Sequence, residues 1–178
     1  MSAPDADAPE EIRWEGKFIT AKQRGRWEYV SRARGIRAAA ILAVDDGHVL
    51  LVEQYRVPLG RPCIEIPAGL IGDENEQESE EETAARELEE ETGYRAETIE
   101  PLGEFWSSPG MVSESFTLMR ATGLTKVSEG GGVDGENITV HRVPLSELPQ
   151  FIEASRTRGC GVDVKLLLLL GGGYLSGA

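Results

Sequence analysis

The chain has 178 residues, a length that suits one domain with at most a short appended element. Acidic residues outnumber basic residues by 31 to 18, which gives a formal net charge of −13. Nucleic acid and anionic membranes would repel so acidic a chain, and we expect neither as a partner.

The ends and the cysteines indicate where the protein works. Residues 1–12 are acidic and rich in alanine and proline, which predicts a disordered tail and not a signal peptide. Two cysteines, Cys63 and Cys160, do not make a disulfide framework. No apolar run approaches the roughly 20 residues that cross a bilayer. These features favour a cytoplasmic protein.

The chain order predicts two parts. Residues 13–35 mix β-forming and basic residues around Gly25, and predict an N-terminal β-hairpin module. Residues 36–178 form the main domain, in which the early strands run as hairpins without helical crossovers, so we expect an α+β sandwich with a mixed sheet. Its strands are expected over residues 36–44, 48–55, 63–66, 97–106, 116–121 and 138–143, and its helices over residues 79–92, 146–158 and 163–170.

The first of these helices carries most of the negative charge. Ser79 and Glu82 have the spacing of a capping box, and Gly93 is a natural end for the helix. From Gly72 to Glu91 there are ten glutamates and one aspartate against one arginine. Such a run of charges is ordinarily a solvated helix face. Only the positions of these glutamates around the helix axis argue for a functional role.

That geometry places three glutamates together. At about 100° per residue, Glu87, Glu90 and Glu91 share one face and Glu89 lies opposite. Like charges on one face are best tolerated when a hard cation such as Mg²⁺ neutralises them. Arg86, four residues before Glu90, is within reach of that carboxylate.

The same stretch resembles the signature of the Nudix hydrolase family, GX5EX7REUXEEXGU. Only the last position departs from it, with Tyr94 in place of an aliphatic residue. Gly69 stands three residues before the glycine that fits the spacing and is an alternative structural glycine, which leaves the role of Glu78 open. The matching positions are Gly72, Glu78, Arg86, Glu87, Leu88, Glu90, Glu91 and Gly93.

The resemblance implies an α/β/α sandwich and a metal-dependent pyrophosphatase. The implied metal ligands are the carbonyl of Ala68 and the side chains of Glu87, Glu90 and Glu91, with two or three Mg²⁺ ions and Mn²⁺ as a possible substitute. Arg86 and Glu90 are implied in catalysis. A mobile-loop glutamate acts as general base in related enzymes, and Glu136 after the glycine-rich loop matches it, with Glu114 as the next candidate.

Other positions resemble the ADP-ribose pyrophosphatases within that family. Pro109 stands fifteen residues after Tyr94, and Arg56 precedes the metal loop, where it would contact the pyrophosphate. In the N-terminal module, Trp27 would stack on adenine. The other substrate-binding positions that the resemblance implies are Glu28, Arg32, Phe18 and Glu114. Trp27 and Phe18 could equally be packing residues of a hairpin.

We therefore expect Mg²⁺-dependent hydrolysis of ADP-ribose to AMP and ribose 5-phosphate by a homodimer. Within the family, a GDP-mannose-type or broad-range dinucleotide enzyme is the alternative. Two alternatives are not enzymes: a Nudix-fold binding module that has lost catalysis, and an acidic scaffold that binds no ligand.

Overall fold

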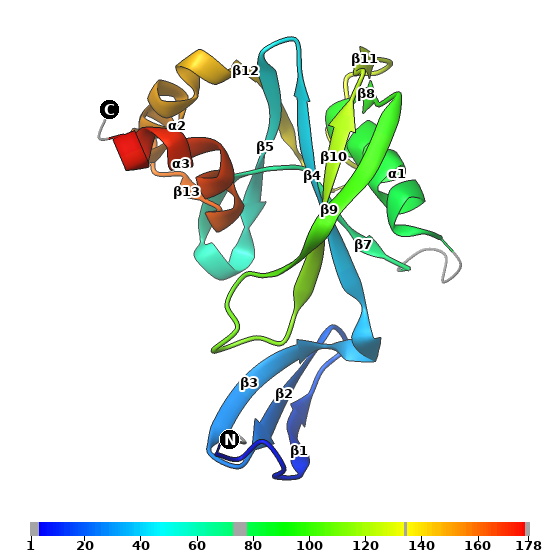
Figure 1. Cartoon of the computed structure of the whole chain (residues 1–178), viewed down its shortest axis with the longest axis vertical. Helices are drawn as coiled ribbons and strands as arrows, with labels where there is room; N and C mark the ends of the chain where they lie inside the picture. The colour runs from blue at the N-terminus through cyan, green and yellow to red at the C-terminus, as the bar shows by residue number, and fades with distance from the viewer. Residues whose placement is uncertain (1–3, 73–77, 134, 177–178) are drawn as a thin grey trace.

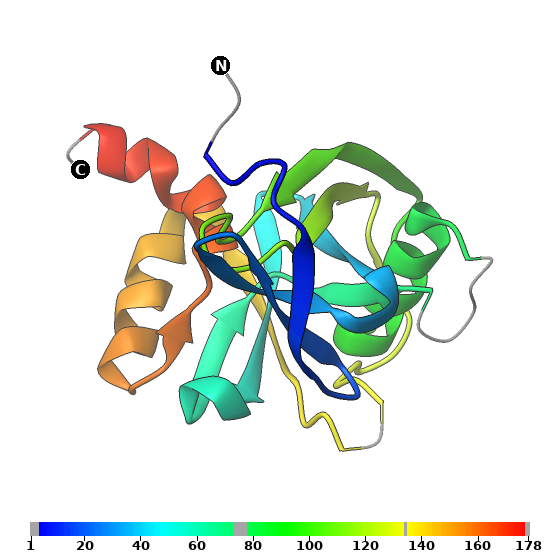
Figure 2. The same cartoon turned by 90° about the horizontal axis from the view of Figure 1, so that it is seen from below.

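The computed structural model describes residues 4–72, 78–133 and 135–176 of the chain. A mixed sheet forms its centre, with one helix on one face and two helices on the other (Figure 1). A small three-stranded sheet projects from one end of this sandwich. Viewed from that end, the small sheet lies between the two helical layers (Figure 2).

The small sheet is the predicted N-terminal module. Its antiparallel strands are β1 (Glu10–Glu15), β2 (Ile19–Arg24) and β3 (Trp27–Arg32). The first strand starts at Glu10, inside the segment predicted as a disordered tail. The reason is electrostatic, because the Glu10 carboxylate binds Lys22 Nζ at 2.8 Å and Arg24 Nη2 at 3.2 Å. The tail prediction is therefore wrong for residues 10–12.

The main sheet confirms the expected α+β class. Its strand order is β13-β6-β5-β4-β10-β9, with β12 added to β5 and β7 added to β4. The pairs β10–β4 and β13–β6 are parallel and the other pairs are antiparallel. Its strands are β4 (Arg37–Asp45), β5 (His48–Arg56), β6 (Arg61–Glu65), β7 (Ala68–Ile71), β9 (Thr98–Trp106), β10 (Ser115–Thr122), β12 (Thr139–Pro144) and β13 (Gly161–Val162), and β8 (Tyr94–Arg95) pairs separately with β11 (Thr125–Lys126).

Strand β7 was not expected from the sequence. The Pro67-Ala68-Gly69 turn was interpreted as the end of a strand, yet the chain continues as β7. The predicted hairpin partner β5 pairs with β4 only at Val44 and Asp45. The first half of β4 therefore has an open edge, and β7 fills it from Arg37 to Ala40.

The helices are α1 (Glu80–Thr92), α2 (Leu148–Thr157) and α3 (Leu167–Ser176). Short 3₁₀ turns are η1 (Ala33–Gly35), η2 (Val57–Leu59), η3 (Leu145–Glu147) and η4 (Val164–Leu166). Helix α3 continues to Ser176, past the expected end at Leu170. None of the helices in the described part of the chain is long and apolar enough to span a membrane.

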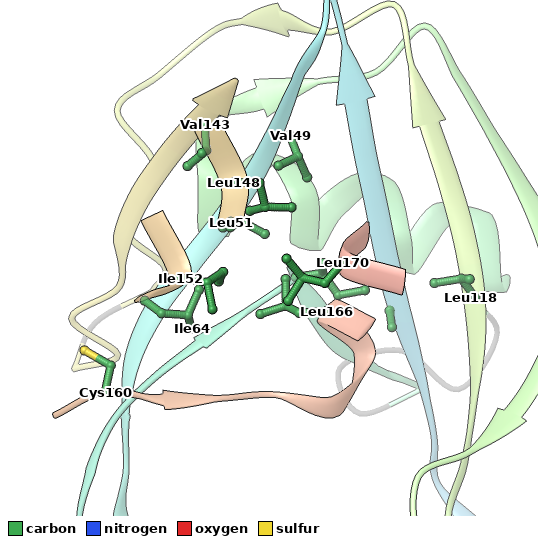
Figure 3. Close-up of a cluster of buried hydrophobic side chains, with 12 residues drawn as sticks. Val49, Leu51, Ile64, Leu118, Val143, Leu148, Ile152, Cys160, Leu166 and Leu170 are labelled. Atoms are coloured by element: carbon green, nitrogen blue, oxygen red, sulfur yellow. The ribbon is translucent and has the colours of Figure 1, made fainter. Parts of the chain in front are cut away.

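Two hydrophobic clusters hold the layers together. Under α1, Ala84 and Leu88 pack on Ile41, Leu50 and Met119 of the sheet. On the other face, α2 and α3 cover a larger cluster, which Figure 3 shows. This second cluster includes Val49, Leu51, Ile64, Leu118, Val143, Leu148, Ile152, Leu166 and Leu170. The packing fixes α1 against one end of the sheet, where the pocket described next opens.

Candidate active site

Helix α1 begins and ends where the sequence predicts. The Glu82 N–H donates to Ser79 Oγ at 3.1 Å, and the Ser79 N–H donates to Glu82 Oε2 at 2.9 Å, which completes the capping box. Gly93 ends the helix with a φ of 75°, in the left-handed region that favours glycine. The glutamates between these caps are therefore held at fixed angles around the axis.

A pocket of about 500 Å³ opens between α1, the β5–β6 hairpin, the 107–114 segment and η4. Carboxylates outnumber cations among its described lining residues, so an anionic ligand would be repelled without a further cation. The carboxylates are Glu65, Glu87, Glu90, Glu91, Glu114 and Glu136, and the cations are Arg32, Arg56, Arg86 and Lys165.

Arg86 links several of these carboxylates. Its Nη1 lies 3.0 Å from Glu90 and 3.1 Å from Glu87, which confirms the expected contact with Glu90. Its Nε lies 3.2 Å from Glu78. This hydrogen bond holds the pKa of Glu78 below its usual value. Glu78, whose role the sequence left open, thus supports Arg86 from outside the pocket.

Two carboxylates of the shared face are desolvated. Burial raises the pKa of Glu87 to about 7 and that of Glu91 to about 8. The Ala68 N–H donates to Glu91 Oε2 at 3.1 Å and opposes this shift. By contrast, Glu89 on the opposite face pairs with exposed Arg95 at 2.9 Å. The predicted division of the helix into two faces is therefore confirmed.

Both candidate box glycines have a structural reason. A Cβ on Gly69 would lie 2.0 Å from the carboxyl carbon of Glu87, so in this arrangement the Glu87 carboxylate occupies the space that a side chain at position 69 would take. Gly72 has a φ of 79° where β7 ends. Gly69 lets the Glu87 side chain lie close to the backbone of β7, and Gly72 lets the chain turn at the end of that strand.

Paired cations line the remaining walls. Arg56 makes a bidentate ion pair with Glu65, with distances of 2.6 and 2.8 Å, and Glu65 is almost fully buried. Arg32 of β3 pairs with Glu114, which joins the N-terminal sheet to the pocket. Each arginine is thus held in position before any ligand arrives.

Glu136 reaches the pocket from the glycine-rich loop. Its Oε2 accepts a hydrogen bond from the Val133 N–H at 2.9 Å. The same loop is bonded to the end of α1, where the Gly131 N–H donates to the Glu91 carbonyl at 2.8 Å. Sequence positions more than forty residues apart therefore meet at one site.

Four predicted substrate-binding residues do not line this pocket. Trp27 and Phe18 lie on the N-terminal sheet and are 55% and 67% exposed. Glu28 lines a separate small pocket near Met111. Pro109 lies in the 107–114 segment, whose Ser107 and Glu114 do line the main pocket. The roles of these four residues stay predictions.

Two charged lining residues, Glu65 and Lys165, were not predicted from the sequence. Glu65 stands between Ile64 and Ile66 in an apolar strand, and this isolated acid was a readable signal of a buried ion pair. Lys165 had no local signal, since it reaches the pocket only because β13 pairs with β6. Its Nζ lies 2.8 Å from Asp163.

The carboxylates of the pocket are the candidate ligands for a hard divalent cation. Within residues 4–72, 78–133 and 135–176, no three Asp, Glu, His or Cys side chains converge closely enough to hold a metal ion as they stand. Arg86 lies between Glu87 and Glu90 instead. The chemistry nevertheless fits, because carboxylate oxygens are the ligands that Mg²⁺ prefers, and both the buried Glu91 and the partly buried Glu87 have raised pKa values.

The NUDIX domain family model matches residues 33–159. A mixed sheet between helical layers, together with the glutamate-bearing helix α1, defines a Nudix-fold hydrolase domain. The model covers well over half of the chain, so the chain belongs to the NUDIX domain family.

Several named proteins are similar to this chain. An ADP-ribose pyrophosphatase from Bacillus subtilis is 39% identical over 119 residues, which is 66% of this chain and 63% of that protein. The match thus spans a little under two thirds of that relative. An ADP-sugar pyrophosphatase from Mus musculus is 37% identical over 171 residues, covering 82% of this chain and 76% of the relative. A GDP-mannose pyrophosphatase from Cronobacter sakazakii is 36% identical over 146 residues, covering 77% and 72%.

A solved structure extends the likeness to the whole fold. The crystal structure of an ADP compounds hydrolase superposes with a TM-score of 0.67, covering 95% of this chain and 92% of that one. Its sequence identity is 23%, so this comparison supports the fold and not the substrate.

Proposed function

We propose that the chain hydrolyses the pyrophosphate bond of ADP-ribose to AMP and ribose 5-phosphate. One observation carries the proposal: the three glutamates on one face of α1 share a pocket with the preorganised Arg56. A diphosphate needs both, because its negative charge must be neutralised and its oxygens oriented. The likeness to pyrophosphatases of ADP-ribose and ADP-sugars supports this substrate.

Glu87, Glu90, Glu91 and the carbonyl of Ala68 would hold Mg²⁺, in two or three ions, with Mn²⁺ as a substitute. When bound, the metal neutralises phosphate charge and polarises the phosphoryl group for attack. Arg86 keeps the carboxylates of Glu87 and Glu90 in place. The excess of carboxylates in the pocket means that metal-free protein should bind the substrate poorly.

Glu136 would act as the general base. The oxygen of a water attacks one phosphorus, the bond from that phosphorus to the bridging oxygen breaks, and the water proton passes to the Glu136 carboxylate. Arg56 donates to the diphosphate oxygens as charge develops on them. Glu114, the other candidate base, is already paired with Arg32.

We further propose a homodimer in which the N-terminal sheet completes the partner's site. Trp27 and Phe18 are exposed and outside the pocket of their own chain, and Ile12 and Trp14 are exposed on the same sheet. Strand β1 is an edge that a partner could cover. Trp27 would stack on adenine in the partner's site, with Glu28 beside it, whereas Arg32 would face the diphosphate in the pocket of its own chain. The cytoplasmic location stays a prediction.

GDP-mannose is the second candidate substrate, because a GDP-mannose pyrophosphatase is also similar to this chain. Specificity constants for ADP-ribose, GDP-mannose, a diadenosine polyphosphate and dGTP, with and without Mg²⁺, decide between them. We expect ADP-ribose to be preferred, with AMP and ribose 5-phosphate as products. A preference for GDP-mannose would make GDP-mannose the substrate in place of ADP-ribose. Inactivity on every compound of the panel would favour a binding module.

A further inference from the structure

The C-terminal end of α1 and the glycine-rich loop are in backbone contact. The N–H groups of Gly131 and Gly132 donate to the carbonyls of Glu91 and Glu90, at 2.8 and 3.0 Å. In the same direction, the Val127 N–H, just after β11, donates to the Gly93 carbonyl at 2.8 Å. The last carbonyls of a helix normally lack partners, and here the loop supplies them.

This contact leaves no room for a side chain on either surface. A Cβ on Gly93 would lie 2.2 Å from the Ser128 carbonyl oxygen. A Cβ on Gly130 would lie 2.4 Å from the Thr92 carbonyl carbon and 2.7 Å from the Glu91 oxygen. These neighbours are backbone atoms, which cannot rotate aside. Two glycines 37 positions apart in sequence thus face each other across one contact.

The contact also fixes both ends of the segment that carries Glu136. On one side Gly132 is bonded to Glu90, and on the other the Ile138 N–H donates to the Gly131 carbonyl at 3.1 Å. Ile138 is buried and anchors the return of the chain into β12. Glu136 therefore lies in a short segment, and hydrogen bonds hold both ends of this segment close to the backbone of α1.

We infer that Gly93 and Gly130 are positioning residues, whose close contact sets the distance between the Glu136 carboxylate and the carboxylates of α1. This rests on the proposed function, in which Glu136 is the base. Gly93, the last glycine of the Nudix signature, then has two roles: it ends the helix and it helps to position Glu136. Gly130 shares the second role, although Gly130 lies outside the signature.

The test is Gly130→Ala, with Gly47→Ala as a matched control. Gly130 and Gly47 have φ values of 67° and 68°, so alanine suffers the same backbone strain at both. Only Gly130 has backbone atoms in the way, because a Cβ on Gly47 has nothing within 4 Å. We expect Gly130→Ala to lower kcat roughly 10- to 100-fold, since a misplacement of about 1 Å costs that much. KM and the Mg²⁺ concentration for half-maximal rate should stay near wild type.

Two further measurements separate positioning from a general loss of structure. In the Glu136→Gln background, adding Gly130→Ala should cause little further loss of kcat, because the group that it displaces is already disabled. Amide hydrogen exchange should show Gly131 and Gly132 protected in the wild type and exposed in Gly130→Ala. The amide of Leu88, inside α1, should stay protected in both.

The outcomes are distinct. An active wild type with equal kcat for Gly130→Ala and Gly47→Ala would overturn the inference, as would fully additive losses with Glu136→Gln. If Gly130→Ala does not fold, unprotected Gly131 and Gly132 amides in the wild type would still contradict the contact. A wild type inactive on every nucleoside diphosphate sugar would instead overturn the proposed function.

Discussion

The glutamate-bearing face of α1 lies in a packed corner of the main sheet, whereas the aromatic residues of the N-terminal sheet lie in solvent. Glu91 is 7% exposed, and Trp27 is 55% exposed. Every cation that lines the main pocket is already paired, whereas Trp27 is not among the residues that line this pocket. The difference is what the proposed function requires, in which one chain supplies the metal-binding and diphosphate-binding residues and the partner's N-terminal sheet supplies the base-stacking residue.

The largest expected effect concerns the packed region. Glu91→Gln or Glu90→Gln should lower kcat by about a thousandfold, because each removes a ligand of a cation worth several kcal/mol to the transition state. Glu89→Gln, which alters the opposite face, should be nearly silent. Steady-state rates for the three variants are the measurement. Equal losses for Glu89→Gln and Glu91→Gln would mean that the helix faces are assigned wrongly.

Glu136→Gln should lower kcat by roughly a hundredfold or more, with KM little changed, because a general base acts on the water and not on substrate affinity. Glu129→Gln is the matched control, since Glu129 is an exposed glutamate near the same glycine-rich loop, paired with Lys126. A normal kcat for Glu136→Gln would mean that another residue is the general base.

Arg56→Ala should lower kcat/KM by roughly 10- to 100-fold, the value of a charge-assisted hydrogen bond to the diphosphate. The control is Arg61→Ala, directly across the β5–β6 hairpin and outside the pocket. Because Glu65 would lose its partner, the melting temperature must be measured as well. An unchanged kcat/KM would remove Arg56 from the site.

On the exposed sheet, Trp27→Ala should raise KM about fivefold or more and leave kcat unchanged, because stacking on a base contributes about 1–3 kcal/mol. Tyr174→Ala is the control, since Tyr174 is a similarly exposed aromatic residue, 57% exposed, on α3 and not on the small sheet. Sedimentation should show a dimer at micromolar concentration. A fully active monomer would contradict the shared site.

The smallest effect is thermal. Carboxyls with pKa values near 7 and 8 hold protons that Mg²⁺ must displace, so the metal should bind more weakly at pH 6 than at pH 8.5. The shift in melting temperature caused by Mg²⁺ should therefore grow as the pH rises. Without metal, stability should fall from about pH 4.5 to pH 8, because the folded state retains protons that the unfolded chain has released. A pH-independent Mg²⁺ shift would contradict this.

The sequence predicted best what local chemistry decides. The limits of α1 follow from Ser79, Glu82 and Gly93, and its faces follow from helical periodicity, so the carboxylate cluster could be foreseen. The longer strands follow from apolar runs and the α+β class from their order. The limits and faces of the helix and the positions of the longer strands depend on residues that are close in sequence, and the class depends only on the order of these elements along the chain.

Long-range pairing could not be foreseen. Lys165 enters the pocket through the parallel pair of β13 with β6, and β7 forms because β5 leaves one edge of β4 open. The separation of Trp27 from the pocket depends on how a small sheet attaches to a large one. Neither short motifs nor periodicity carries such information.

The burial of Glu91 has a consequence for laboratory evolution. A carboxyl taken out of water with a pKa raised to about 8 lowers the stability of the metal-free fold, and a glutamine of nearly the same shape avoids that cost. Selection of this chain for heat resistance alone would therefore favour replacing the residues that its chemistry needs. A variant library ranked only by melting temperature would drift toward durable but inactive proteins.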